Sequence, residues 1–343
     1  MNQSKAGAVL FSMLFVASAA FAANPASDNA SDAVYAKPFP QWVDGDNGGT
    51  GFSPWTLSPN PNSFNAGFFT ATATQNGNFP SGGGIDTTSL SNPSPNSWGL
   101  YANTNVFFNS AIAYRSFTGG SLGVGQTFTI GMDNGYVGEA TNLNAVVGFV
   151  LRNGNDTTNK NNGQRFEFLF IGGDCCYQIS TNFLSPLVAT GMGYTDGGLL
   201  ISFTLTGVDS FSCTITSLVG GTSTNITGTL GGPQGAGIDS VALYNQWAGN
   251  GQNFDLFFNS LSVTGVVSSP FTITSMKLLG GTNAVVSFDT LLGTVYSVEA
   301  NTNLLSGSWS TVASNISGTG GSVLITNPVP AGTPKEFYRA RHP

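Results

Sequence analysis

The sequence predicts an all-β protein made of two β-sandwiches. Short runs of alternating apolar and polar residues recur along the chain, with Gly, Asn, Asp and Ser clusters between them. Amphipathic helical patterns are nearly absent. Charged residues make up only 8% of the chain, although aromatic residues make up 12% and there are 46 glycines. Aromatic content this high excludes disorder. The surface is therefore expected to consist of Thr, Ser, Asn and Gly, which suits hydrogen bonding to neutral, hydroxyl-rich ligands.

The first 22 residues read as a secretory signal peptide. Lys5 precedes an apolar run over residues 6–16, and Ala20-Phe21-Ala22 supplies a small-residue cleavage site. A membrane anchor is the alternative, but the run is short for a helix that needs about 20 apolar residues to cross a bilayer. We therefore expect a secreted, cell-surface or periplasmic protein with no transmembrane span in the mature chain. Residues 23–37 are predicted to be a flexible leader.

Residues 38–267 carry the strand pattern of a large sandwich. The run 127–132 (TFTIGM) alternates, and the run 165–171 (RFEFLFI) places three Phe residues on one face. Residues 201–216 read as a hairpin with its turn at 207–210, and a later strand is expected to bulge near Asn259. Strands this numerous, joined by turns, indicate a double-sheet jelly roll.

A second domain is predicted over residues 268–343. One strand ends at Val263, and Pro270 opens a new series of six or seven short strands. That number of strands in about 70 residues is typical of a small immunoglobulin- or fibronectin-like sandwich.

Two resemblances follow from these patterns. Residues 271–341 resemble a C-terminal module of many exported bacterial proteins, which implies an accessory sandwich without catalytic activity. The matching pieces are Tyr296-Ser297-Val298-Glu299, Asn303-Leu304, Trp309 and Phe337-Tyr338-Arg339. The larger part resembles concanavalin A-like or LamG-like glycan-binding sandwiches in strand pattern, size and composition. No binding residue is transferred from that resemblance.

Charge and cysteine content narrow the possible ligands. A net charge of −7 and scattered basic residues argue against nucleic acid, which needs clustered Lys and Arg. Cys213 could form a disulfide with Cys175 or Cys176, or be a small buried apolar residue. Zinc is very improbable, because the chain has no C-x-x-C and its single histidine is His342.

Residues 44–55 (DGDNGGTGFSPW) raise the question of a metal site. An EF-hand is excluded because Trp55 stands where a bidentate Glu is required, and a phosphate loop is excluded because no Lys follows the glycines. Two interpretations remain. Asp44, Asp46 and Asn47 could bind Ca²⁺, joined by Asp255 if the first and last strands pair. Alternatively, the stretch is an Asx-turn, and Trp42 and Trp55 are core or lid aromatics.

Catalysis has little support in the sequence. One histidine excludes hydrolase triads, and the E-x-D-x-x-E signature of jelly-roll glycosidases is missing. Residues 165–168, 177–180 and 243–246 are similar to the strand motifs of jelly-roll alginate lyases, with matches at Arg165, Gln178, Tyr244 and Gln246. However, Ser180 stands where those enzymes have a His, and the basic residues of the motifs are missing. A lyase or glycosidase is therefore a distant third hypothesis.

Two aromatic stretches are candidate glycan contacts, because sugar faces stack on rings and are held by amide and carboxyl groups. Residues 97–103 (SWGLYAN) and 243–253 (LYNQWAGNGQN) contain them, and Arg115 is a rare charge nearby. The candidate ligand-binding residues are Trp98, Tyr101, Arg115, Tyr244, Asn245, Gln246, Trp247 and Asn250. Core packing is the alternative for each aromatic residue.

Two functions remain from these observations. The first is an exported, non-catalytic protein that binds a neutral polysaccharide or cell-surface glycan. The second is a structural cell-surface or matrix protein with no small ligand. A row of exposed aromatics on a concave sheet would favour the first, and a flat polar face above buried aromatics would favour the second.

Overall fold

A computed structural model gives the structure of most of the chain. It describes residues 25–59, 61–72, 96–104, 109–138, 145–182, 186–195, 197–265, 273–280, 282–290, 295–303, 308–319, 321–329 and 336–341. The predicted signal peptide and His342 lie outside these residues. The chain separates between Val267 and Ser268 into two compact units, each of which is described by itself.

The regular secondary structure in the described part of the large unit is almost entirely strand. Its strands are β1 (Ala26–Asp28), β2 (Thr56–Ser58), β3 (Ala66–Thr72), β4 (Asn96–Ala102), β5 (Ser110–Ser116), β6 (Thr127–Asn134), β7 (Val146–Arg152) and β8 (Gln164–Ile171). They continue with β9 (Cys176–Ser180), β10 (Leu187–Gly193), β11 (Leu199–Gly207), β12 (Ser210–Ser217), β13 (Ser223–Thr229), β14 (Ser240–Gln246) and β15 (Leu256–Thr264). Two single-turn 3-10 helices, η1 (Ala33–Tyr35) and η2 (Gln252–Phe254), are the helical elements among the described residues. None of the described helices is long and apolar enough to cross a membrane.

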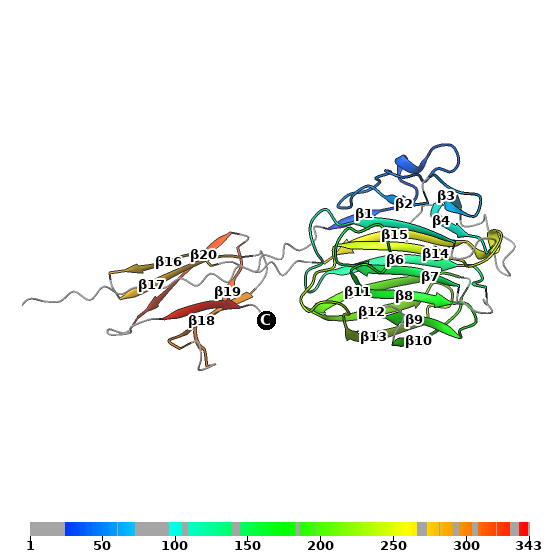
Figure 1. Cartoon of the computed structure of the whole chain (residues 1–343). Helices are drawn as coiled ribbons and strands as arrows, with labels where there is room; N and C mark the ends of the chain where they lie inside the picture. Colours follow the sequence, from blue (N-terminus) through cyan, green and yellow to red (C-terminus); the bar gives the residue numbers. More distant parts are fainter. Residues whose placement is uncertain are drawn as a thin grey trace, which may run out of the picture. The chain divides into compact units, whose positions relative to one another are not determined.

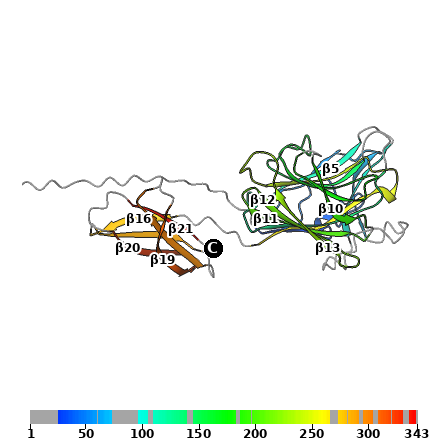
Figure 2. The ribbon, with the colours of Figure 1, turned by 90° about the horizontal axis from the view of Figure 1, so that it is seen from below.

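The strands form two antiparallel sheets. One sheet has the order β13-β12-β11-β6-β15-β4-β3, with β1 also paired to β15, and the other has the order β10-β9-β8-β7-β14-β5-β2. Figure 1 shows the first sheet running from β1 down to β13, and Figure 2 shows the large unit turned by 90°. The all-β prediction is confirmed.

The alternation of core-facing and outward-facing residues along the strands explains why the two sheets pack together. Buried and half-buried residues alternate along β12 and along residues 199–205 of β11, because one face lies in the core and the other does not. Phe166, Phe168 and Phe170 of β8 contribute to that core, together with Phe128 and Phe203 from the facing sheet. The hairpin predicted over 201–216 is formed by the antiparallel pair β11 and β12, whose register shifts between Leu205 and Gly207 beside the turn.

The bulge predicted near Asn259 is present in β15. The pairing of β15 with β6 shifts register between Asn259 and Ser262. The Asn259 side chain is buried and accepts from the Ala30 N–H at 3.1 Å, while its amide donates to the Asn96 carbonyl at 2.9 Å. Before the bulge β15 pairs with β4, and after it β15 pairs with β1.

The flexible leader predicted over residues 23–37 is wrong for the part that the structure describes, residues 25–37. Ala26–Asp28 form β1, which pairs with Leu261–Val263, and Tyr35 is only 2% exposed. Polar composition suggested mobility, but Asp28 is held by a buried partner that lies 87 residues away in sequence.

The small unit contains two three-stranded antiparallel sheets in its described residues. Its strands are β16 (Ile273–Leu279), β17 (Asn283–Asp289), β18 (Val295–Asn301), β19 (Ser310–Ser317), β20 (Ser322–Pro328) and β21 (Phe337–Arg341). One sheet has the order β16-β17-β20 and the other β19-β18-β21. Phe288, Tyr296 and Val298 are buried between them. The assignment of this sandwich to an immunoglobulin or fibronectin class stays a prediction.

Candidate functional site

Trp98, predicted to stack on a ligand, is instead a core residue. It is fully buried, with its ring centroid 5.5 Å from Trp55 and 6.1 Å from Trp42. Tyr35 packs edge-on against it at 5.6 Å. The core-packing alternative therefore holds for this residue, and its ring is not available to a sugar.

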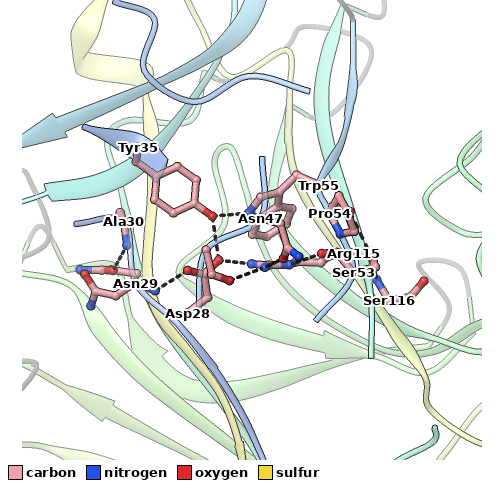
Figure 3. A network of polar contacts seen from close by, with 12 residues as sticks. Asp28, Asn29, Ala30, Tyr35, Asn47, Ser53, Pro54, Trp55, Arg115 and Ser116 are labelled. Carbon is pink, nitrogen blue, oxygen red and sulfur yellow. Dashed lines mark hydrogen bonds and ion pairs between the residues drawn. The ribbon is translucent and has the colours of Figure 1, made fainter. Parts of the chain in front are cut away.

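Arg115 ties the N-terminal segment to the sandwich. It forms a buried ion pair with Asp28 and lies over the Trp55 ring at 4.7 Å (Figure 3). Asp28 also accepts from the Tyr35 hydroxyl at 2.7 Å. Burial raises the pKa of Asp28 to about 6, although Arg115 opposes that shift. Each group in this network is satisfied inside the protein, so Arg115 is structural and does not face a ligand.

The acidic stretch 44–55 forms a turn against β1. Asp44 accepts from the Leu57 N–H at 2.8 Å, and Asp46 accepts from the Val43 N–H at 2.9 Å while pairing with Lys37 at 2.5 Å. A Cβ at Gly49 would lie 1.8 Å from the Ser27 carbonyl oxygen, so β1 can pass this closely only over a glycine.

The four predicted calcium ligands do not gather in the structure. The Asn47 side-chain oxygen accepts from Arg115 at 2.8 Å, and Asp255 lies beside Tyr101. The described residues contain no group of three or more His, Cys, Asp or Glu side chains placed to share a metal ion. Asp44 and Asp46 accept backbone N–H groups, which fits a structural turn, but neither accepts from the N–H two residues later that defines an Asx-turn. Calcium binding stays a prediction.

Tyr244 lies in a buried polar cluster on the outer face of the seven-stranded sheet. Its hydroxyl donates to Glu167 at 2.8 Å, and Lys160 donates to the same carboxylate at 2.7 Å. The Lys160 ammonium also lies 3.9 Å from the centre of the Tyr244 ring. Burial lowers the pKa of Lys160, and burial together with Glu167 raises the pKa of Tyr244 far above its ordinary value. Because Tyr244 and Glu167 are fully buried, this cluster closes the loop that carries Lys160 over the sheet and presents no surface to a ligand.

The three lyase-like motifs lie on strands of the same sheet, namely β8, β9 and β14. Their side chains do not converge on a cleft. Arg165 is paired with Asp209 at 2.5 Å and donates to the carbonyl of Pro233 at 2.6 Å. Gln178 donates to Asp174 at 2.6 Å, and Gln246 is half-buried between β5 and β7. This arrangement offers no described cation to neutralise a uronate.

The two predicted aromatic stretches meet at one end of the large unit. Asn245, fully buried, donates to the Leu100 carbonyl at 3.0 Å, and Asn250 accepts from the Thr104 N–H at 2.8 Å. Tyr101 is half-buried and donates to the Ser63 carbonyl at 2.7 Å. Trp247 is also half-buried, with a positive φ of 61°. The sequence thus identified neighbouring segments, but polar atoms of Tyr101, Asn245 and Asn250 bond to the backbone of the protein.

Asp255 differs from the other residues of this region because it is a buried carboxyl group with a strongly shifted pKa. Its side chain is 7% exposed, and burial raises its pKa well above the ordinary value. Burial, with a smaller contribution from the Asp255 carboxylate, raises the pKa of the half-buried Tyr101.

The outer face of the eight-stranded sheet carries two rows of hydroxyl and amide side chains in register. We call these rows the hydroxyl face. Row one is Thr264, Thr127, Thr204, Ser212 and Thr227, on β15, β6, β11, β12 and β13. Row two is Ser27, Ser262, Thr129, Ser202, Thr214 and Asn225, which adds β1. All of them are half-buried or exposed, and none is charged.

The geometry of a sheet fixes the spacing of these groups. Neighbouring strands lie about 4.8 Å apart, so the six positions of row two span roughly 24 Å. Some hydroxyls pair within the face, as Thr127 does with Thr204 at 2.8 Å. In the part of the chain that the structure describes, Thr129, Ser202 and Ser262 have no protein partner for their hydroxyls and can bond to solvent or ligand.

The sequence contained a signal for the hydroxyl face. Nearly every polar position of the runs 127–132, 201–206 and 210–216 is Ser or Thr, whereas strand surfaces ordinarily include charged residues. The register that aligns those positions across six strands is set by core packing and could not be seen in the sequence.

A shallow groove of about 340 Å³ lies beside β3 and β4. It is lined by Tyr35, Ala36, Lys37, Pro38, Gln41, Thr70, Ala71 and Asn96. Lys37, its charged wall residue, is already paired with Asp46.

No family model matches the chain, and no curated protein matches it. Among solved structures, it is similar to a carbohydrate esterase of the Shiga toxin-encoding bacteriophage phi24B, at 12% identity and a TM-score of 0.37 over 62% of this chain and 90% of that one. It is also similar to lectin I-B4 of Griffonia simplicifolia, at 12% identity and a TM-score of 0.32 over 62% of this chain and 99% of that one. Lectin II of Ulex europaeus matches at 13% identity and a TM-score of 0.29 over 59% and 92%. Similarity this low gives no basis for transferring an activity.

Proposed function

We propose that the protein is an exported, non-catalytic β-sandwich that binds a neutral polysaccharide on its hydroxyl face. The observation that carries this proposal is the register of row two, which aligns uncharged hydroxyl and amide groups across six strands. Export rests on the signal peptide predicted over residues 1–22.

The chemistry of the face matches a sugar polymer better than an ionic one. Ser and Thr hydroxyls both donate and accept hydrogen bonds, as sugar hydroxyls do. A fully ionic ligand would lose its hydration without gaining a counter-charge, because neither row contains a charged side chain. Each hydroxyl contact is weak, so affinity would come from many contacts along one polymer chain.

The test is adsorption to insoluble neutral polysaccharides, with cellulose, chitin and a β-1,3-glucan as the probes. We expect retention that is insensitive to added NaCl, because no ion pairs are involved. The double variant Ser202→Lys/Thr214→Lys places two charged chains in the middle of row two and should raise the Kd for the polysaccharide at least about tenfold, the equivalent of about 1.4 kcal/mol.

A matched control carries the same added charge elsewhere. Asn155 and Thr157 are exposed in the loop after β7, so Asn155→Lys/Thr157→Lys should bind as the unmodified protein does. Equal retention of both double variants would contradict the placement of the site. Parallel runs with EDTA test whether calcium contributes to binding.

The structural alternative has one specific observation in its favour. Trp98 and Tyr244, two of the predicted stacking residues, are fully buried, and the hydroxyl face is polar. Absence of retention on every probe would favour a cell-surface or matrix component with no small ligand.

A further inference from the structure

Cys175 and Cys176 form a disulfide between adjacent residues, the last residue of the turn after β8 and the first residue of β9. Cys175 is exposed and Cys176 is half-exposed, so solvent reaches the bond. The sequence had left open a bond from one of these residues to Cys213. The structure instead places Cys213 in the core on β12, fully buried, where burial raises the pKa of its thiol to about 12.

The residues after the disulfide are anchored independently of it. The Tyr177 ring stacks on Phe168 at 5.4 Å, and its hydroxyl donates to Asn134 at 2.7 Å. Its carbonyl accepts from Thr190 on β10 at 2.8 Å. The β9–β10 pair is therefore held by core contacts and hydrogen bonds that do not involve sulfur.

We propose that Cys175 and Cys176 are a reversible thiol–disulfide site, opened by low-molecular-weight thiols, whose dithiol form binds thiophilic ions and trivalent arsenicals through both sulfurs. Exposed disulfides are the ones that exchange readily with external thiols. One thiolate attacks a cysteine sulfur and forms a mixed disulfide, and a second thiolate displaces the protein sulfur. Two external thiols are thereby oxidised to one disulfide, and the protein gains two S–H groups.

Because Cys175 and Cys176 are adjacent, their two thiols can act as a bidentate ligand after the disulfide has been reduced. Soft thiolates select soft ions, and two of them on neighbouring residues can bind one ion without moving the strands. A trivalent arsenical oxide suits this geometry, because condensation of its As=O group with two S–H groups forms two As–S bonds and releases one water. The buried Cys213 is not accessible to compete for the ion.

The experiment uses the full chain under native conditions and alkylation with iodoacetamide, followed by peptide mass mapping. Without reductant, we expect no labelling at residues 175 and 176. After treatment with glutathione or dithiothreitol, both residues should be labelled and Cys213 should stay unlabelled. Phenylarsine oxide added after removal of the reductant should block that labelling, and the thermal unfolding transition should remain.

Controls separate the site from general unfolding. The variant Cys175→Ser/Cys176→Ser should fold and bind no phenylarsine oxide, and Cys213→Ala should leave arsenical binding unchanged. Labelling before reduction would show that no disulfide forms, and labelling only in denaturant would show that the bond is closed to external thiols. Either result, or reduction that abolishes the folding transition, would overturn the proposal. None of these measurements depends on polysaccharide retention, so they test this proposal separately from the proposed function.

Discussion

At the scale of single residues, Asp28 links stability to pH. Its pKa of about 6 in the folded chain lies above the ordinary value of 3.8, so the folded state binds this proton more tightly than the unfolded state. The resulting stabilisation is present below about pH 4 and is lost as pH rises through about 6, and it amounts to about 3 kcal/mol at most.

The variant Asp28→Asn has no proton to lose at this position. The difference in unfolding free energy between the unmodified protein and Asp28→Asn, from urea denaturation, should therefore shrink as pH rises from about 4 to about 7. Other carboxylates are common to both proteins and cancel. A difference that does not depend on pH would contradict the raised pKa of Asp28.

The buried cluster of Lys160, Glu167 and Tyr244 makes a second prediction at this scale. Lys160→Met should cost about 3–5 kcal/mol in unfolding free energy, because it leaves the Glu167 charge buried without its cation. Tyr244→Phe should cost less, about 1.5–3 kcal/mol, since it removes one hydrogen bond to the buried carboxylate.

A double-mutant cycle distinguishes this ion pair from ordinary packing. Lys160→Met/Glu167→Gln should be less destabilised than the sum of the two single variants, because neither unpaired charge remains. Additive effects, measured by chemical denaturation, would mean that Lys160 and Glu167 do not interact.

Residue roles were predicted less well than residue positions. Trp98, Arg115 and Tyr244 stood out in the sequence, but all three are buried. Their partners, which include Trp42, Asp28 and Glu167, are distant in the chain, and composition alone does not reveal such pairs. A single sequence therefore could not distinguish a core aromatic from one that contacts a ligand.

At the scale of elements, β11 and β12 were predictable because buried residues alternate along nearly all of each strand, with one face in the core. β1 was not predictable. It has only three residues, of which Ser27 and Asp28 are polar. Its pairing depends on the bulge in β15 and on the ion pair between Asp28 and Arg115. Short strands that are held by long-range contacts show no local periodicity in the sequence, so they cannot be predicted from it.

The contact between β3 and β4 allows a prediction at this scale. A Cβ at Gly99 would lie 2.5 Å from the ring of Phe69, which is packed edge-on against Phe257 at 5.8 Å. Gly99→Ala should therefore cost about 1–3 kcal/mol through overpacking.

Two companion variants make this test specific. At Gly193 on β10 a Cβ would meet its nearest atom at 3.8 Å, so Gly193→Ala should be close to neutral. Phe69→Leu should relieve part of the cost of Gly99→Ala. An equal loss of unfolding free energy for the variants at Gly99 and Gly193 would show that the Phe69 ring is not responsible, because Gly→Ala without a clash is neutral or slightly stabilising.

At the scale of the whole molecule, the two units have separate cores. The core of the large unit draws on both of its sheets, whereas that of the small unit is centred on Phe288, Tyr296 and Val298. A smaller core buries a smaller fraction of its chain and is less stable. We therefore expect two thermal transitions in calorimetry, with the small unit unfolding first.

One core variant in each unit assigns the transitions. Phe288→Ala should remove about 3–5 kcal/mol from the small unit and shift or abolish the first transition alone, while polysaccharide retention on the hydroxyl face persists. Phe166→Ala should shift the second transition by a comparable energy, because Phe166 packs between Phe203 and Phe211 in the large core. If either variant moved both transitions together, the units would fold as one cooperative body, and the hydroxyl face would depend on the small unit for its stability.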